Sequence, residues 1–496
     1  MAITTRIQLY GDVPFNPNSA HIRLFSSTVE QTAYFNSRAA APLTAYLTQR
    51  LESPLIAEGP LSTFKNINYI GIYNLNQWYY CYVNGIEYVN DNTTKIYFDI
   101  DPFQTWMMNK NIKSAYVERE HVNDDAIGRN LVPENLNTGD YTSTAVPVSQ
   151  YFSEMKAVLL ATEVAVGDLP ESAASKVNNI LVPGVRLETT DAETLAGTLS
   201  DYTKNGKSSA IMDIFMSPTF CTWRSTGVDE MVLSVPRPNS LDGYTPKNNK
   251  LYTYPYMFCL ATNNLGETSI LKWELSQDTS DITIKINGIV GTKPTIFAYP
   301  YGYKNVTDCY TDGLTLTNFP QCAWINDSYA NWKGQQQQTI VGDVVKVAAG
   351  AVVGGITGGV AGAVTGAGIG AINSAAGRMT SDIQHEVVPS SVSGQLKNNS
   401  LNIAQGNNGF TYYRMSIRND IAQMIDNYFE VYGYAVNKMK VPNITGRPTW
   451  NYVKCSNAVV SGNMPSWAIQ RWENALNSGV TFWHTNDVGN YSLNNH

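Results

Sequence analysis

Residues 347–377 of this 496-residue chain contain no charged side chain. The segment is bounded by Lys346 and Arg378, and glycine recurs at every fourth position from Gly350 to Gly370. If the segment is helical, these glycines fall on one face and leave bare backbone there, which suits close contact between helices inside a membrane. A large and otherwise polar chain has little reason to carry such a segment unless the segment meets lipid.

The length of this segment favours a membrane more strongly than its hydrophobicity does. As a helix, its 31 residues would extend about 46 Å, which exceeds the ~30 Å hydrocarbon core of a bilayer. Its eight valine and isoleucine residues contribute only about −2 to −5 kcal/mol to insertion, and each of its ten glycines costs about 0.8–1 kcal/mol relative to alanine in a helix. One copy should therefore be a poor anchor, whereas several copies packed together could insert as a bundle.

The candidate membrane-active residues lie in the repeating part of the segment and are Gly350, Val353, Gly354, Ile356, Gly358, Val360, Gly362, Val364, Gly366, Ile369 and Gly370. The other interpretation of the segment is a buried glycine-rich hairpin or a flexible linker. Flexible linkers are usually polar and rich in serine, whereas valine and isoleucine run through residues 347–377. We therefore favour membrane activity over a linker.

The overall composition argues for a β-rich protein and against a nucleic-acid binder. Thirty tyrosines suit the pleated surface of sheets. A net charge of −7 leaves no clustered excess of basic residues for phosphate contacts, although DNA could still pass through a wide acidic channel. The six cysteines are scattered without C-x-x-C spacing, which predicts reduced and mostly buried thiols: Cys81, Cys221, Cys259, Cys309, Cys322 and Cys455.

Local patterns predict several elements. Aromatic runs at Gln77–Val83 and Lys95–Ile100 predict hairpin strands, with turn chemistry at Asn84-Gly85 and in the run starting at Asp91. The remaining predictions are a buried strand from Lys156, a helix from Asp191 to Asn205-Gly206, an alternating strand with a turn at Asn287-Gly288, a helix ended by Gly433 and a helix over Pro465–Asn477. The helix before Gly433 is expected to bury one face made of Ile421, Met424, Ile425, Tyr428, Phe429 and Tyr432.

We find no pattern typical of an enzyme, a metal site or a cofactor site. Gly206-Lys207-Ser208 has the end of a phosphate-binding loop, but Asp201 stands where its first glycine is required. His121 and His484 lie near acidic residues, yet no cluster of further ligands accompanies them, so hydrogen-bonded structural histidines are expected. A carboxylate pair at Asp99 and Asp101 would suit a glycosidase, but strand alternation explains it equally well.

Several blocks of sequence, in order along the chain, resemble the distal tail (tail knob) protein of small short-tailed, picovirus-type bacteriophages. They are Asp12–Phe15 (DVPF), Asp99–Trp106 (DIDPFQTW), Tyr116–Asp125 (YVEREHVNDD), Val431–Asn443 (VYGYAVNKMKVPN), Asn451–Cys455 (NYVKC) and Ser478–Asn495. Residues 347–377 lie between these blocks, where that family keeps a long hydrophobic loop. The resemblance covers roughly the first 125 and the last 180 residues.

The resemblance implies a mainly β fold with minor α content, in which β-barrel domains of six copies assemble into a tube at the tail tip. It implies that hydrophobic loops plug the tube and then enter the host cytoplasmic membrane, where they form a channel for the genome. The implied partners are further copies of the chain (a hexamer), other phage tail proteins, the host membrane, and viral DNA that passes without specific binding. The implied location is the distal end of the virion tail.

On this basis we expect a β-barrel tube domain over residues 1–128 and a second β-rich or mixed domain over 129–317. A long loop over 318–406 would contain residues 347–377, and an α+β part over 407–496 would complete the tube. The alternative function is a cell-wall-binding or receptor-binding tail protein whose hydrophobic loop is only a plug. A wall-degrading hydrolase is disfavoured because no catalytic constellation is present.

Overall fold

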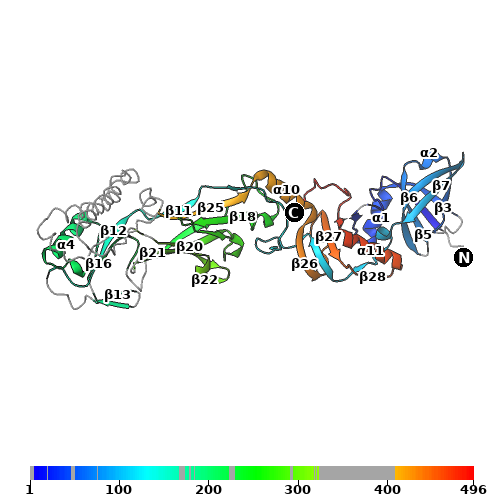
Figure 1. The fold of residues 1–496 in the computed structure, drawn as a ribbon. Helices are drawn as coiled ribbons and strands as arrows, with labels where there is room; N and C mark the ends of the chain where they lie inside the picture. The colour runs from blue at the N-terminus through cyan, green and yellow to red at the C-terminus, as the bar shows by residue number, and fades with distance from the viewer. Residues whose placement is uncertain are drawn as a thin grey trace, which may run out of the picture. The chain divides into compact units, whose positions relative to one another are not determined.

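The protein is mainly β with minor α content, as the sequence predicts (Figure 1). The computed structural model describes residues 5–18, 20–45, 51–74, 76–166, 174–177, 180–183, 185–222, 230–290, 294–317, 319, 321–322 and 408–496. The chain forms two compact units. Unit 1 comprises residues 1–139, 244–251 and 419–496, and unit 2 comprises residues 140–243 and 252–418.

The N-terminal part of unit 1 is a six-stranded antiparallel sheet. Its strands lie in the order β3 (Ala39–Ala45), β1 (Thr5–Gly11), β5 (Ile67–Asn74), β6 (Gln77–Asn90), β7 (Thr93–Ile100) and β4 (Leu55–Glu58). Alternate residues face opposite sides, so Ile70 enters an aliphatic core while Tyr69 enters an aromatic core with Phe35 of α1 (Thr28–Ser37). The short helix α2 (Leu61–Phe64) adds Phe64 to the aliphatic core.

One predicted turn in this sheet is wrong. Strands β6 and β7 form the predicted hairpin, but β6 continues through Asn84-Gly85 and the chain reverses only after Asn90. The pairing register shifts between Val83 and Gly85, so the glycine marks a β-bulge in a long strand. A bulge and a turn draw on the same residue types, which is why the dipeptide alone does not distinguish them.

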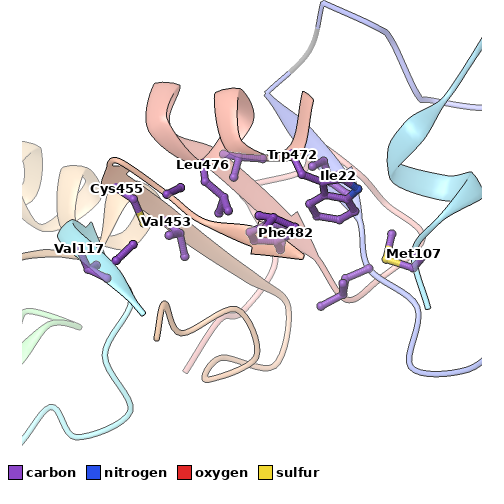
Figure 2. Close-up of a cluster of buried hydrophobic side chains, with 13 residues drawn as sticks. Ile22, Met107, Val117, Val453, Cys455, Trp472, Leu476 and Phe482 are labelled. Atoms are coloured by element: carbon purple, nitrogen blue, oxygen red, sulfur yellow. The ribbon is translucent and has the colours of Figure 1, made fainter. Parts of the chain in front are cut away.

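The rest of unit 1 is built on a five-stranded sheet covered by a helix. The strands lie in the order β2 (His21–Arg23), β29 (Val480–Trp483), β27 (Trp450–Ser456), β9 (Ala115–Glu120) and β26 (Tyr434–Lys440). Figure 2 shows Trp472 and Leu476 of α11 (Ser466–Ser478) packed toward Phe482 and Val453 of this sheet. The pair β8 (Asn111–Ile112) and β28 (Val460–Ser461) and the short helix α3 (Pro102–Thr105) complete this part.

Unit 2 contains three larger sheets and a two-stranded pair. The first has the order β10 (Tyr141–Ser143), β25 (Gly409–Ile417), β18 (Met257–Thr262) and β19 (Thr268–Leu271), with β11 (Val148–Tyr151) also on β25. The second has the order β15 (Val185–Thr189), β12 (Met155–Ala161), β16 (Ile211–Pro218) and β24 (Gln321–Cys322). The third has the order β17 (Glu230–Pro236), β20 (Asp281–Val290), β21 (Pro294–Tyr303) and β22 (Val306–Asp308), with β23 (Leu314–Leu316) also on β21. The two-stranded pair is β13 (Ala174–Val177) with β14 (Ile180–Pro183).

Two predictions in unit 2 are confirmed and one is wrong. Strand β12 lies where the buried strand is predicted. Helix α4 (Ala192–Lys204) begins where the helix from Asp191 is predicted, and the Asp191 carboxylate caps it by accepting from the amides of Glu193 and Thr194 at 3.1 and 3.0 Å. The predicted turn at Asn287-Gly288 does not occur, because β20 runs straight through it. A Cβ atom at Gly288 would lie 2.8 Å from the ring of Phe220, so this glycine provides room for a neighbouring side chain.

Candidate functional site

The predicted membrane-active residues, from Gly350 to Gly370, lie outside the described residues. The structure instead describes the residues of unit 2 that flank residues 323–407 in the sequence. We call these flanking residues the upstream root (residues 314–317, 319 and 321–322) and the downstream root (residues 408–411). They are the described part of the candidate functional site.

The downstream root is held by backbone contact. Gly409 pairs with Tyr151 of β11, and a Cβ atom at this glycine would lie 2.0 Å from the carbonyl oxygen of Gln150. The Asn264 side-chain amide donates to the Gly409 carbonyl oxygen at 3.1 Å. The adjacent Phe410 is fully buried, so the chain enters β25 through a close fit that only glycine permits at position 409.

The upstream root is held by apolar burial and short strand pairings. Strand β23 pairs with β21, and its Leu316 is fully buried. Phe319 is also buried, and β24 then pairs with Ile214 and Phe215 of β16. Both roots are therefore fixed to sheets of unit 2, and the hydrophobic segment is an insertion between two anchored strands.

A second site, which the sequence analysis missed, lies on α10 (Asn419–Tyr432) in unit 1. This helix ends at Gly433, as predicted, with a left-handed φ of 64°. Its buried face differs from the prediction: Met424 and Tyr432 are exposed, whereas Asp426 and Glu430 are buried. The signal that could have revealed this face is the pair of acids four residues apart, beside Ile425 and Phe429 in the apolar stripe.

Asp426 binds the short segment 244–251, which is far away in the sequence. Its carboxylate accepts from the hydroxyl of Tyr244 at 2.7 Å and from the backbone amides of Lys247 and Asn248 at 2.7 and 3.0 Å. The side-chain amide of Asn248 adds a fourth donor at 2.8 Å. A buried carboxylate becomes tolerable when several donors replace its water shell, so Asp426 fixes the backbone of this segment.

Further acids complete what we call the acid cluster: Asp125, Glu134, Asp426 and Glu430. Asp125 accepts from the Asn249 amide at 3.0 Å and from the Tyr434 hydroxyl at 2.6 Å, and burial raises the pKa of its carboxyl group despite these bonds. Glu134 accepts from the Lys250 ammonium at 2.8 Å and also pairs with Arg119. Burial lowers the pKa of Lys250, although Glu134 acts in the opposite direction.

His121 adds a neutral ring to the same region. Its Nδ1 accepts from the backbone amide of Tyr452 at 2.7 Å, and its Nε2 lies 3.0 Å from the carbonyl oxygen of Glu430. A ring with one accepting and one donating nitrogen is uncharged. Burial lowers the pKa of His121 to about 4. His484 is likewise hydrogen-bonded, through Nε2 to the Asn451 side chain at 3.1 Å, so the expectation of structural histidines is confirmed for both.

The blocks of sequence that carry the resemblance come together in unit 1. Strand β9, which contains the first half of Tyr116–Asp125, pairs with β26 on one side and with β27 on the other. Strand β29 from the C-terminal block pairs with β27. Val13 and Phe15 of the N-terminal block join the aromatic core beside Tyr69. Segments from both ends of the chain thus build one folded unit.

The described side chains offer little reactive chemistry. Asp99 and Asp101 do not form a carboxylate pair: Asp99 is exposed, while Asp101 is buried and caps α3 by accepting from the Phe103 amide at 2.8 Å. Burial raises the pKa of Cys221 to about 11 and that of Cys455 to about 12, which disfavours their thiolates. In the part of the chain that the structure describes, no group of three His, Cys, Asp or Glu residues could hold a metal ion. No helix within the described ranges has the length and apolar character needed to cross a membrane.

Comparison with known proteins relates this β-rich chain to phage tail proteins. Residues 3–111 match the model of the caudoviral major tail protein N-terminus, and residues 220–496 match that of the C-terminal domain of the Bacillus phage phi29 tail knob protein gp9. The tail knob proteins gp9 of Bacillus phages PZA and phi29 are each 23% identical to the chain, and each alignment covers 99% of this chain and 98% of the relative.

A solved structure supports the same fold assignment. The tail knob protein gp12 of bacteriophage C1 superposes with a TM-score of 0.62 at 16% identity, covering 97% of both chains. The fold and the two matched regions define the class as a structural protein of a phage tail. The chain belongs to the phi29 gp9 family of tail knob proteins, which confirms the resemblance drawn from the sequence blocks. Its place is therefore the virion tail, where other tail proteins adjoin it.

Proposed function

We propose that this tail knob protein assembles as a hexameric tube at the distal tip of the tail and delivers the genome through a membrane channel. Residues 347–377 plug the tube, leave it on infection and enter the host cytoplasmic membrane together. DNA then passes without specific binding. The chain acts as a structural protein, without catalysis, cofactor or metal.

The observation that carries this proposal is an uncharged, glycine-striped segment inserted between two anchored roots. Gly409 at the downstream root and Leu316 at the upstream root lie in paired strands of unit 2. Such an insertion can change its surroundings without requiring the sheets that flank it to unfold. Membership of the tail knob family supports the location at which this change would meet a host cell.

The weak hydrophobicity of one copy supports an oligomer. Residues 347–377 hold ten glycines, and close packing of small residues between helices replaces the missing hydrophobic strength. The proposal also assigns a role to each part of the chain. Residues 1–128 and 407–496 build the tube, residues 129–317 form a second domain, and residues 318–406 form the loop.

Leakage from dye-loaded vesicles tests the membrane activity. The intact protein is compared with a variant that lacks residues 335–405, which retains both roots. We expect leakage from the intact protein and at least a tenfold lower rate from the deletion variant. Circular dichroism and electron microscopy of both proteins check that folding and assembly are unchanged. Equal leakage from both proteins would contradict the pore and leave the plug of a receptor-binding or wall-binding tail protein as the better account.

Matched substitutions separate packing from hydrophobicity. Gly358→Leu and Gly362→Leu fill the glycine stripe, whereas Val360→Leu lies off the stripe and adds apolar surface without filling it. We expect the two glycine variants to leak less and Val360→Leu to leak as much as the parent protein. Increased leakage from the glycine variants would show that hydrophobicity limits insertion. Electron microscopy tests the tube independently: a stable monomer at every concentration would contradict the hexamer.

A further inference from the structure

A pocket of about 420 Å³ lies in unit 1, and no residue of the acid cluster is among the residues that line it. Its lining combines apolar residues, charged residues and other polar residues. They are Leu24, Phe25 and Ile444, then Arg23, Glu30 and Lys110, then Ser26, Thr445 and His484. All of these residues belong to unit 1. A mostly apolar hollow with a few convergent polar groups is the usual form of a small-molecule site.

Most of the charge in this pocket is already compensated. Arg23 is buried, its guanidinium donates to Glu30 at 2.8 Å, and its other nitrogens contact the Trp483 carbonyl oxygen at 3.2 Å and the Asn486 side chain at 3.4 Å. Glu30 also accepts from the backbone amide and the hydroxyl of Ser26 at 2.8 and 2.7 Å. Arg23 and Glu30 therefore neutralise each other.

Lys110 is the charge that remains. Its ammonium group donates to the carbonyl oxygen of Met107 at 2.9 Å and lies 5.5 Å from the ring centre of Trp472. Among the described residues it forms no ion pair with a carboxylate. Burial lowers the pKa of Lys110 to about 8, because desolvation disfavours the charged form.

His484 adds no further positive charge to the pocket. Its Nε2 contacts Asn451, and burial lowers the pKa of its ring. At neutral pH the pocket therefore holds Arg23 and Lys110 against Glu30 alone, which leaves one positive charge. A bound anion would restore the balance and would be attracted more strongly there than in water, since the pocket is partly desolvated.

We propose that this pocket binds a small oxyanion, a carboxylate or phosphate group, with Lys110 as its principal ligand. The charge balance selects an anion over a cation, and the apolar wall of Leu24, Phe25 and Ile444 accommodates a small organic body attached to that group. Thr445, which also lines the pocket, carries a hydroxyl group that could add a second polar contact. The site is independent of the proposed membrane activity.

Amine labelling of the intact protein tests the site directly. Acetylation by the N-hydroxysuccinimide ester of acetic acid at pH 8 is followed by mass spectrometry, in chloride, acetate or phosphate at equal ionic strength. Lys113, exposed and three residues along the chain, is the internal control. We expect an oxyanion at about 20 mM to lower the labelling of Lys110, relative to Lys113, by about threefold, as a Kd near 10 mM would produce.

The two oxyanions distinguish the source of the ligand. Protection by acetate alone supports a carboxylate, protection by phosphate alone supports a phosphate, and protection by both supports an oxyanion of either kind. A Lys110-to-Lys113 labelling ratio that is the same in all three salts would overturn the proposal. Lys110→Met, which keeps an apolar side chain beside Trp472, should abolish the rise in melting temperature that the oxyanion produces, and Lys113→Met should retain it. An equal rise in the two variants would also overturn the proposal.

Discussion

The segment 244–251 in unit 1 and the downstream root in unit 2 are held by opposite means. Asp426 holds the first through hydrogen bonds from Tyr244, Lys247 and Asn248 to one buried carboxylate. Strand pairing and the close approach of Gly409 to the Gln150 carbonyl hold the second. The first attachment depends on a charge and the second on shape.

This difference predicts which kind of substitution destabilises each region. A buried carboxylate surrounded by donors is stable only while every donor has its partner, because each orphaned group keeps its desolvation cost. A backbone fit contains no titratable group and responds only to added volume. We therefore expect unit 1 to be sensitive to charge and pH, and the downstream root to be sensitive to side-chain size.

The largest expected effect comes from removing the central carboxylate. Asp426→Ala leaves the buried donors of Asn248 and the partly buried amide of Lys247 without an acceptor. We expect it to lower the unfolding free energy of unit 1 by about 3–5 kcal/mol. Hydrogen exchange monitored by mass spectrometry should show faster exchange in peptides that cover residues 244–251. Exchange in β12 of unit 2 should be unchanged.

Met424→Ala is the matched control on the same helix, because Met424 is exposed. It should change the stability by less than about 0.5 kcal/mol. If Asp426→Ala affects exchange in unit 1 no more than this control does, the acid cluster does not hold the segment and the comparison fails.

The next largest effect is a loss of stability in acid. The pKa of His121 is about 4 in the folded protein and 6.5 when unperturbed, so the unfolded chain binds the proton first as the pH falls. The unfolding free energy of unit 1 should therefore decrease between pH 6.5 and 4, by up to about 3 kcal/mol from this residue. Below pH 4 His121 should contribute no further loss. Hydrogen exchange in β9 and β27, corrected for intrinsic rates, measures the change.

Two acids modify this pH dependence in opposite directions. Burial raises the pKa of Glu430, but the neighbouring His496, Lys247 and Arg447 lower it more, so Glu430 adds to the loss as the pH falls through its folded pKa. The raised pKa of Asp125 acts in the other direction, because its protonated form is favoured in the folded state. His121→Gln should flatten the dependence between pH 6.5 and 4 and leave it unchanged between pH 7 and 8.5. An identical slope in both proteins across the acid range would exclude His121 as its source.

The smallest effect concerns the downstream root. Gly409→Ala places a Cβ atom 2.0 Å from the Gln150 carbonyl oxygen, so the strands must separate, and we expect a loss of about 1–3 kcal/mol confined to β11 and β25. Gly197→Ala in α4 is the control, because nothing lies within 4 Å of the added atom and alanine favours a helix by about 0.8–1 kcal/mol. The first variant should melt lower and the second slightly higher. Equal melting temperatures for Gly409→Ala and the parent protein would show that the root is not closely packed.

Elements with strong local signals were predictable from the sequence. Asp191 and Pro465 mark the starts of α4 and α11, and alternating isoleucines mark β20, because capping and periodic burial are local properties. The turns predicted at Gly85 and Gly288 were wrong. Gly85 lies at a β-bulge in the pairing of β6 with β7, and Gly288 lies against the ring of Phe220. Both roles depend on residues that are distant in the sequence.

By itself, the sequence determined the mainly β fold, the family and the presence of an uncharged, glycine-striped insertion at residues 347–377. These properties follow from composition, residue spacing and the order of motifs, which can be read without knowing which residues contact one another in the fold. Only the tertiary structure decided that Asp426 and Glu430 turn inward and that Lys110 remains without a carboxylate partner among the described residues. The physical reason is that the cost of burying a charge depends on the donors and charges around it, and segments such as 244–251 reach that charge from far along the chain.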